Sequence, residues 1–287
     1  TREVPDVLIA ACVKWVDLNP DIDPLRGTVE ARPHGAGLSE ADHAAVELAL
    51  RIAEQWGGEV VVTCAGPPEA DAALRDLLGA GAQRALRVEP ESPHGAVAPT
   101  SAEVARMLVD AWGDARPDLV VCGDASVDRG SGSVPAFVAH ELGAAQALGL
   151  VEVTPEQPGR LTAVRRLDGA RREVLAVGTP AVVSVEGSVA TLRRAPLSAV
   201  LAARDREVEV HRVLRADAGE EPRLRPWRPR PRALPAPEGD RALERIVALT
   251  GAHVERTPPR TLVLDPPEAA EAILAQLREW GYLADED

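Results

Sequence analysis

The sequence predicts an open, mainly parallel, doubly wound α/β sheet with an added hairpin and an extended C-terminal arm. Short apolar runs alternate with amphipathic segments through the first half of the chain, which is typical of a parallel sheet covered by helices on both faces. From Arg204 onward the chain becomes charged, and residues 224–239 are rich in proline and arginine. Such a stretch forms no regular element, so it is expected to act as a linker or extended arm.

Four strand–helix units make up the first half of the chain. The apolar runs expected to form its strands are Val7–Val16, Glu59–Cys64, Arg84–Val88 and Leu119–Cys122. The helical segments that follow them are one that starts at Ser39, then Glu69–Leu78, Ser101–Trp112 and Val134–Leu142. Ser39 suits a helix N-cap, and Asp42 three residues later completes a capping box.

The pattern changes beyond the fourth unit. Leu161–Arg166 and Arg172–Val177 flank an Asp-Gly turn and predict a hairpin. Pro180–Val185 is expected to form a further strand, and Ser198–Ala203 a short helix. These elements close a predicted nucleotide-binding α/β domain of residues 1–204.

The rest of the chain is expected to form a charged, Pro- and Arg-rich linker over residues 205–239 and a helix–strand–helix arm over residues 240–287. The predicted elements of the arm are helix Asp240–Thr250, strand Thr261–Leu264 and helix Pro267–Trp280. The last helix places its apolar residues on one face: Ala270, Ile273, Leu274, Leu277 and Trp280. Such a face requires a partner surface, on this chain or on another subunit.

Composition narrows the classes of function. The 287 residues include 45 acidic and 32 basic side chains, and the net charge of −13 disfavours nucleic acid as a partner. Three widely spaced cysteines form no CxxC pair, so neither a zinc site nor a redox disulfide is expected. No apolar run reaches the roughly 18 residues of a membrane span, and no signal peptide is seen. The expected location is therefore the cytoplasm, without membrane insertion.

A ligand site is expected at the carboxyl ends of the strands, near the point where the strand order reverses. Three segments should meet there: Cys12–Lys14, Cys64–Pro67 and Gly123–Ser133. The third ends in a Gly-Ser-Gly-Ser run at the start of a helix, where backbone N–H groups and the helix dipole favour a nucleotide phosphate. The same run also suits an ordinary turn, and the residues alone leave both interpretations open.

The sequence shows no arrangement of residues that is typical of a catalytic site. The six histidines are scattered, so no cysteine or serine has an evident base. Asp and Glu pairs with metal-ligand spacing are also absent, and each cysteine is explained as a small buried apolar residue at a strand end. The sequence therefore predicts neither a catalytic site nor a metal site.

Several motifs, taken in order, carry a resemblance to a known family. They are Cys12-Val13-Lys14, Leu38–Glu47, Cys64–Pro68 with Gly79–Ala85, Cys122–Asp128, Pro180–Val183 with Leu197–Arg204, and the closing helix Glu268–Gly281. In this order and spacing, the chain resembles the β subunit of electron-transfer flavoproteins over nearly its whole length. Only the Pro/Arg-rich arm and its neighbours lack a counterpart.

The resemblance implies a heterodimer with an α subunit that holds FAD, a β subunit that binds AMP structurally, and a flavin or other dehydrogenase as electron donor. A bifurcating subset of the family holds a second FAD in the β-subunit site. The implied nucleotide contacts are Cys12, Ser39, Cys64, Gly123, Val127, Asp128, Gly130, Ser131, Gly132, Ser133 and Val134. The implied partner-docking loop is residues 186–196, with Glu186, Val189, Leu192 and Pro196 as its docking residues.

The chain departs from the family pattern at several of these positions. Ser39 replaces an Asn at the helix start, Ser133 replaces a Gln, and Pro135 replaces a Gly, which together weaken the implied AMP site. The usual basic cluster after the docking loop is thinned to residues 203–206, which implies an unusual dehydrogenase partner. A variant associated with the peptide cofactor mycofactocin is one candidate.

Two other functions fit the same fold class, which is that of adenine-nucleotide α-hydrolases and universal stress proteins. A stand-alone nucleotide sensor of the universal-stress type would end near the sheet, whereas this chain continues from Asp205 for about eighty residues. An ATP-pyrophosphatase would need a Ser/Gly-rich loop directly after the first strand. Lys14–Asp17 stands there instead, which argues against that enzyme.

Overall fold

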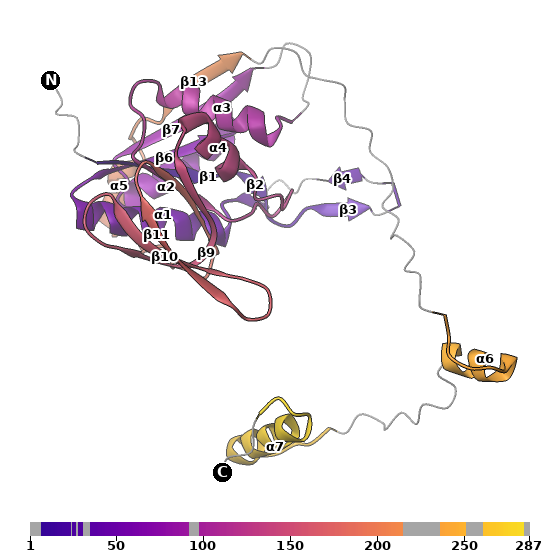
Figure 1. Cartoon of the computed structure of the whole chain (residues 1–287). Coiled ribbons are helices and arrows are strands. Elements are labelled where there is room, and N and C mark those ends of the chain that lie inside the picture. Colours follow the sequence, from indigo (N-terminus) through magenta and orange to yellow (C-terminus); the bar gives the residue numbers. More distant parts are fainter. Residues whose placement is uncertain are drawn as a thin grey trace. The chain divides into compact units, whose positions relative to one another are not determined.

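A computed structural model describes residues 7–23, 25–26, 28–30, 35–91, 98–214, 236–250 and 261–283 (Figure 1). The chain divides into two compact units, Thr1–Trp227 and Arg228–Asp287, which are described separately. Within the described ranges, none of the helices is both long and apolar enough to cross a membrane.

The first unit is built on a nine-stranded sheet with the order β11-β10-β9-β12-β8-β1-β6-β7-β13. Its strands are β1 Leu8–Val13, β6 Glu59–Ala65, β7 Arg84–Glu91, β8 Leu119–Gly123, β9 Ala145–Pro155, β10 Arg160–Arg166, β11 Arg172–Gly178, β12 Ala181–Val185 and β13 Glu209–Leu214. From β9 across to β13 every neighbouring pair is parallel, whereas β10 runs antiparallel to both β9 and β11. The predicted fold, an open and mainly parallel sheet with an added hairpin, is confirmed.

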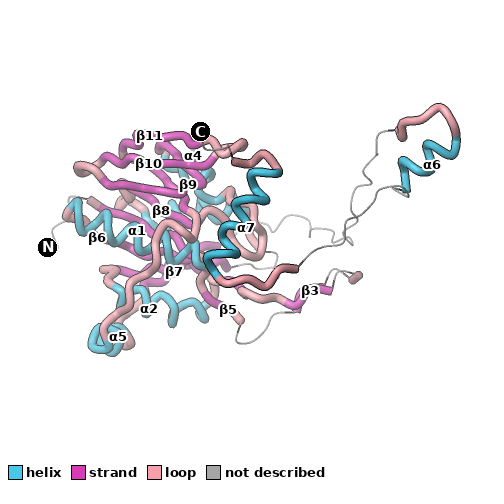
Figure 2. Tube along the Cα trace, turned by 90° about the horizontal axis from the view of Figure 1, so that it is seen from below, coloured by secondary structure: helices cyan, strands magenta, loops and turns pink. Residues whose placement is uncertain are grey.

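Helices cover both faces of this sheet (Figures 1 and 2). One face carries α1 Glu40–Trp56, α2 Asp71–Ala80 and α5 Leu197–Ala203, and the other carries α3 Ser101–Trp112 and α4 Val134–Leu142. Alternation along β1 supplies both cores, because Ile9 and Ala11 pack with α1 whereas Ala10 and Cys12 pack with α3 and α4.

Local capping explains where the two longest helices of this unit begin. The Ser39 hydroxyl accepts from the Asp42 N–H at 3.2 Å, and the Asp42 carboxylate accepts from the Ser39 N–H at 3.0 Å, which confirms the predicted capping box. Thr100 and Glu103 form the same arrangement before α3. The segments predicted as helices at Ser101–Trp112 and Val134–Leu142 have those bounds, and Glu69–Leu78 corresponds to a 3₁₀ turn, Pro68–Ala70, followed by α2.

Two strands of the sheet were not predicted. β9 is eleven residues long, but it contains Gly149 and ends at Pro155, two residue types that are uncommon in strands, so its sequence did not predict a strand. β13 is an edge strand whose exposed, charged residues resemble a linker, yet it pairs with β7, and Arg84 binds Glu209 across the pair at 2.7 Å. The sheet therefore extends beyond residue 204, where its domain was expected to end.

The segment after β1 also differs from the prediction. The strand expected over Val7–Val16 stops at Val13, and short antiparallel pairs follow in a stretch without predicted elements. These pairs are β2 Val16–Asp17 with β5 Ala36–Gly37, and β3 Asp21–Asp23 with β4 Thr28–Glu30.

The second unit contains α6 Ala242–Thr250 and α7 Pro266–Glu279, as predicted to within a few residues. The strand expected at Thr261–Leu264 is wrong, because these residues adopt no regular structure. Residues 215–235, most of the expected linker, lie outside the described residues. On α7, Ile273 and Leu274 are 60% and 42% exposed, so the described part of the second unit does not by itself bury the predicted apolar face.

Candidate functional site

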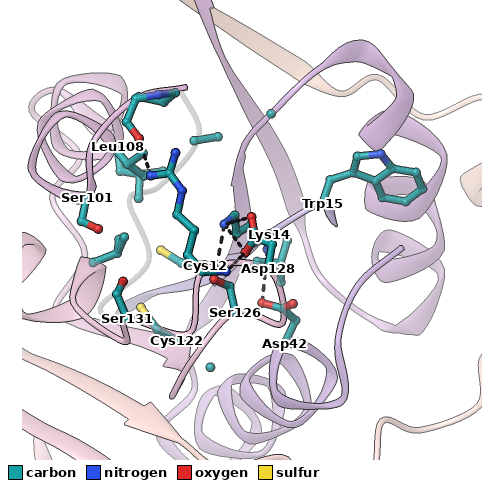
Figure 3. Close-up of a pocket in the computed structure, with 18 of the residues that line it drawn as sticks. Cys12, Lys14, Trp15, Asp42, Ser101, Leu108, Cys122, Ser126, Asp128 and Ser131 are labelled. Atoms are coloured by element: carbon teal, nitrogen blue, oxygen red, sulfur yellow. Dashed lines mark hydrogen bonds and ion pairs between the residues drawn. The ribbon is translucent and has the colours of Figure 1, made fainter. Parts of the chain in front are cut away.

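A pocket of about 540 Å³ lies at the topological switch point of the sheet (Figure 3). The chain passes from β1 to β6 and β7 on one side, and then returns to β8 on the other side of β1. The pocket is lined by the residues that follow β1, β6 and β8, by the loop of residues 123–133, and by the start of α3. Open parallel sheets bind ligands at this position, and the pocket therefore lies where the sequence predicted a ligand site.

Lys14, the only lysine of the chain, reaches into the pocket from the end of β1 (Figure 3). Its ammonium nitrogen donates to the two carboxylate oxygens of Asp128 at 2.6 and 2.7 Å and to the Ser126 hydroxyl at 3.3 Å. Burial acts to raise the pKa of Asp128, but the bonds from Lys14 and Ser126 outweigh it and lower that pKa. The pair thus holds the loop after β8 against the end of β1.

Asp42, in the first turn of α1, supports the same strand end. It accepts the backbone N–H of Lys14 at 3.2 Å and the hydroxyl of Ser39 at 2.6 Å. Burial raises the pKa of Asp42 above its ordinary value, while the hydrogen bonds from Ser39 and Lys14 act in the opposite direction. Ser39 therefore acts here as a helix cap, and the pocket is not lined by it.

Two glycines allow the loop of residues 123–133 to fold tightly. Gly132 has φ of +57°, and a Cβ atom there would lie 2.6 Å from the carbonyl oxygen of Asp124. Gly123 approaches the first turn of α1, where an added Cβ would lie 3.0 Å from the Cβ of Ala41. The loop shape therefore depends on the absence of side chains at these positions.

Three serine hydroxyls gather where this loop meets the starts of α3 and α4. Ser133 donates to Ser101 at 2.9 Å and lies 3.1 Å from the hydroxyl of Ser131. Beside them, Arg129 donates to the carbonyl of Pro99 at 2.8 Å. Two helix starts, three hydroxyls and the Lys14 and Arg129 cations form a surface suited to an anionic group.

Two of the three cysteines, Cys12 and Cys64, have pKa values above the ordinary one. Cys12 and Cys122 are free cysteines that lie opposite each other on β1 and β8, and both line the pocket. A hydrogen bond with Cys122 together with burial raises the pKa of Cys12 well above its ordinary value. Burial also raises the pKa of Cys64 to about 11. Thiols with raised pKa values stay protonated at neutral pH and are poor nucleophiles.

The structure brings most of the predicted nucleotide contacts together. Those that line the pocket are Cys12, Gly123, Asp128, Ser131, Gly132, Ser133 and Val134. Those that do not line it are Ser39, Cys64, Val127 and Gly130. Cys64 instead packs in the core beneath α1 and α2, and Val127 is exposed. Whether any of these residues contacts a nucleotide stays a prediction.

The sequence analysis did not place Ser101 in the site, and it included Ser126 and Arg129 only as members of the segment Gly123–Ser133, without a role for either side chain. Ser101 could have been found, because the Thr100–Glu103 capping box marks a helix start after a strand expected in the same sheet. Ser126 and Arg129 act through a loop conformation that has no sequence pattern. Among the described residues, no group of three or more His, Cys, Asp or Glu side chains could hold a metal ion.

The four predicted docking residues lie between β12 and α5. Val189 and Leu192 are partly buried against the core, whereas Pro196 is the exposed N-cap residue of α5. Glu186 binds Arg166 of β10 at 2.7 Å. The sequence did not single out Arg193, which makes more hydrogen bonds to α1 than any of these four.

Comparison with known proteins decides the family. A family model described as the electron transfer flavoprotein domain matches residues 27–216. The chain belongs to the electron transfer flavoprotein family. Its β-subunit type follows from relatives named electron transfer flavoprotein subunit beta, so the resemblance drawn from the sequence is confirmed.

Two of these relatives are bacterial β subunits. The subunit of Mycobacterium tuberculosis (strain H37Rv) is 34% identical over 189 residues, which cover 64% of this chain and 69% of the relative. That of Chromohalobacter salexigens is 31% identical over 247 residues, covering 84% and 87%. Protein FixA of Azorhizobium caulinodans is 28% identical over 209 residues, covering 70% and 74%. An electron-transfer role of the β-subunit or FixA type is thus supported for this flavoprotein chain.

In this electron transfer flavoprotein chain, the Lys14–Asp128 pair has a testable pH dependence. Lys14→Met should lower the free energy of unfolding by about 0.5 kcal/mol at pH 7, since the pair is partly exposed. The pKa of Asp128 is lowered by folding, so this contribution is present above the unfolded-state pKa and is lost as pH falls through the lower folded-state pKa. Urea unfolding from pH 7 to pH 2.5 should show the difference between variant and wild type shrinking toward zero.

The control for this pair is Asp128→Asn, alone and combined with Lys14→Met. If the two side chains act together, the double variant should be no less stable than the weaker single variant. Additive losses, or a difference that does not change with pH, would show that the ion pair does not connect the loop to β1.

Proposed function

We propose that this chain is the β subunit of a heterodimeric electron-transfer flavoprotein and binds AMP as a structural ligand in the switch-point pocket. In this role it helps to carry electrons from a flavin or other dehydrogenase to a downstream acceptor. The supporting observation is the lining of the switch-point pocket in this member of the family. The starts of α3 and α4, three serine hydroxyls and the side chains of Lys14 and Arg129 all border the same space. The α subunit holds the FAD, so no redox group is required on this chain.

The pocket suits the two chemically different ends of a mononucleotide. Its volume lies within the usual range for small-molecule sites. Val104 and Leu108 of α3 supply an apolar wall against which a purine base can pack. The phosphate would lie by the Ser133 hydroxyl at the start of α4, with Lys14 and Arg129 close enough to line the same space.

The chain is proposed to be a carrier subunit without a catalytic site of its own. The Cys12 thiol has a raised pKa, and the ammonium group of Lys14 donates hydrogen bonds to Asp128 and Ser126. Neither arrangement provides a nucleophile at neutral pH. The pocket residues are therefore expected to bind a ligand and to shape the subunit.

Ligand release tests the proposed cofactor. The αβ complex, purified without added nucleotide, should release about one AMP per complex on heating, identified by mass spectrometry. All the FAD should remain assignable to the α subunit, because the chain expressed alone should carry no flavin. Stoichiometric FAD on the isolated chain would contradict the AMP assignment and favour the bifurcating type. A chain that carries AMP but never binds an α subunit would favour the stand-alone sensor.

A further inference from the structure

We propose that Arg193 is a positioning residue that fixes the loop of residues 186–196 on helix α1. The inference rests on the proposed function and on the docking of a partner dehydrogenase that the family resemblance implies for this loop. Arg193 itself does not need to touch that partner. Its role would be to set the loop conformation that the partner meets.

Arg193 binds a buried carboxylate in the middle of α1. The Glu47 side chain is 4% exposed, and its Oε2 atom accepts both the backbone N–H of Arg193 at 3.1 Å and the Nε–H of Arg193 at 2.9 Å. The Oε1 atom accepts from Nη2 of Arg193 at 3.2 Å and from Nε of Arg51 at 2.8 Å. Main chain and side chain of one loop residue are thus held by one carboxylate.

A second carboxylate of α1 also binds the Arg193 side chain. Glu54 lies seven residues after Glu47, on the same side of the helix, and accepts from Nη1 and Nη2 of Arg193. Burial acts to raise the pKa of Glu47, but the bonds from Arg193 and Arg51 outweigh it and lower that pKa. A carboxylate that is buried and ionised needs its partners, so the position of Arg193 is strongly specified.

The loop follows α1 along its length. An added Cβ at Gly187 would lie 3.1 Å from the Cβ of Glu40, so the loop begins in close contact with the first turn of the helix. Val189 and Leu192 then pack against the core cluster to which α1 contributes. The contacts at Gly187 and Arg193 therefore fix the loop near its start and near its end.

The same helix supports the nucleotide pocket. Its first turn carries Asp42, which holds the end of β1, and packs against Gly123, where β8 ends. Helix α1 is thus a shared support for the pocket and the docking loop. Arg193 joins the docking loop to α1 through the carboxylates of Glu47 and Glu54. The neighbouring residue Arg194 is exposed and provides a matched control.

Hydrogen–deuterium exchange of the full chain, alone and in complex with the α subunit, tests this role. Arg193→Ala should accelerate exchange of the amides of residues 187–195 by at least ten-fold, while Arg194→Ala should leave them as in wild type. The double variant Arg193→Ala with Glu47→Gln removes the unpaired buried charge. It should recover the unfolding midpoint of wild type and still exchange rapidly in the loop.

Arg193→Lys separates positioning from simple charge balance. Lysine keeps the positive charge but lacks the planar guanidinium group that binds both Glu47 and Glu54. Compared with Arg193→Ala, the Arg193→Lys variant should therefore regain the unfolding midpoint of wild type but only part of the slow hydrogen exchange of the loop. Loop exchange in Arg193→Ala that equals that of Arg194→Ala would overturn the proposal, as would full recovery of loop protection by lysine. Because the chain alone suffices for this readout, failure to bind an α subunit would contradict the proposed function without affecting the result on Arg193.

Discussion

A chain that ends at Arg215 is expected to fold and yet to bind the flavin-bearing α subunit at least about 100-fold more weakly than the full chain. All strands of the main sheet end by Leu214, so this truncation keeps the sheet and its two cores intact. It removes α7, whose apolar residues Ile273 and Leu274, with nearby Trp280, are not buried by the described part of their own unit. Burial of each large apolar side chain contributes roughly 1.5–3 kcal/mol, and a factor of 100 in affinity requires only about 2.7 kcal/mol.

Titration calorimetry with the separately purified α subunit measures this effect, and circular dichroism checks the fold of the truncated chain. Ile273→Asp with Leu274→Asp in the full chain should weaken binding as the truncation does. Glu271→Gln, on the same exposed helix, should not. Unchanged affinity of the truncated chain would show that the tail is not an assembly element.

Gly132→Ala is expected to lower AMP affinity by at least about 100-fold. The backbone there has φ of +57°, and the new Cβ would lie 2.6 Å from the Asp124 carbonyl oxygen, so the loop must open. Left-handed backbone strain alone costs on the order of 1–3 kcal/mol, but the steric conflict moves the residues that face the ligand. Titration calorimetry of AMP into the nucleotide-free αβ complex compares the dissociation constants of the variant and wild type.

Gly169→Ala is the matched control for the glycine variant. Gly169 has φ of +70° in the turn between β10 and β11, and no atom lies within 4 Å of an added Cβ. This variant should lose some stability for the same backbone reason and keep its AMP affinity. Equal loss of AMP in both variants would mean that general destabilisation, and not the loop at the pocket, explains the effect.

Elements with strong local signals could be predicted from the sequence. The α1 capping box and the Asp-Gly hairpin turn depend on residues a few positions apart, so they were visible before the fold was known. β13 was missed because an exposed, charged edge strand differs from a linker only through its pairing with β7. β9 was missed because Gly149 and Pro155 break the strand pattern.

The site was predictable to a similar extent. The strand-end rule located the pocket and its Gly/Ser loop, since that rule depends only on strand order. The bonds from Lys14 to Asp128 and from Arg193 to Glu47 join residues more than a hundred positions apart. No local pattern marks such pairs, although the status of Lys14 as the only lysine was a useful hint.

Co-purification from the native host tests the central claim most directly. A tag on this chain should recover a flavin-containing partner of similar size in a one-to-one complex, with FAD bound to the partner and AMP released from this chain on heating. Recovery of the chain with a bound nucleotide but without any flavoprotein partner would contradict the account and would leave a stand-alone nucleotide-binding sensor as the better explanation.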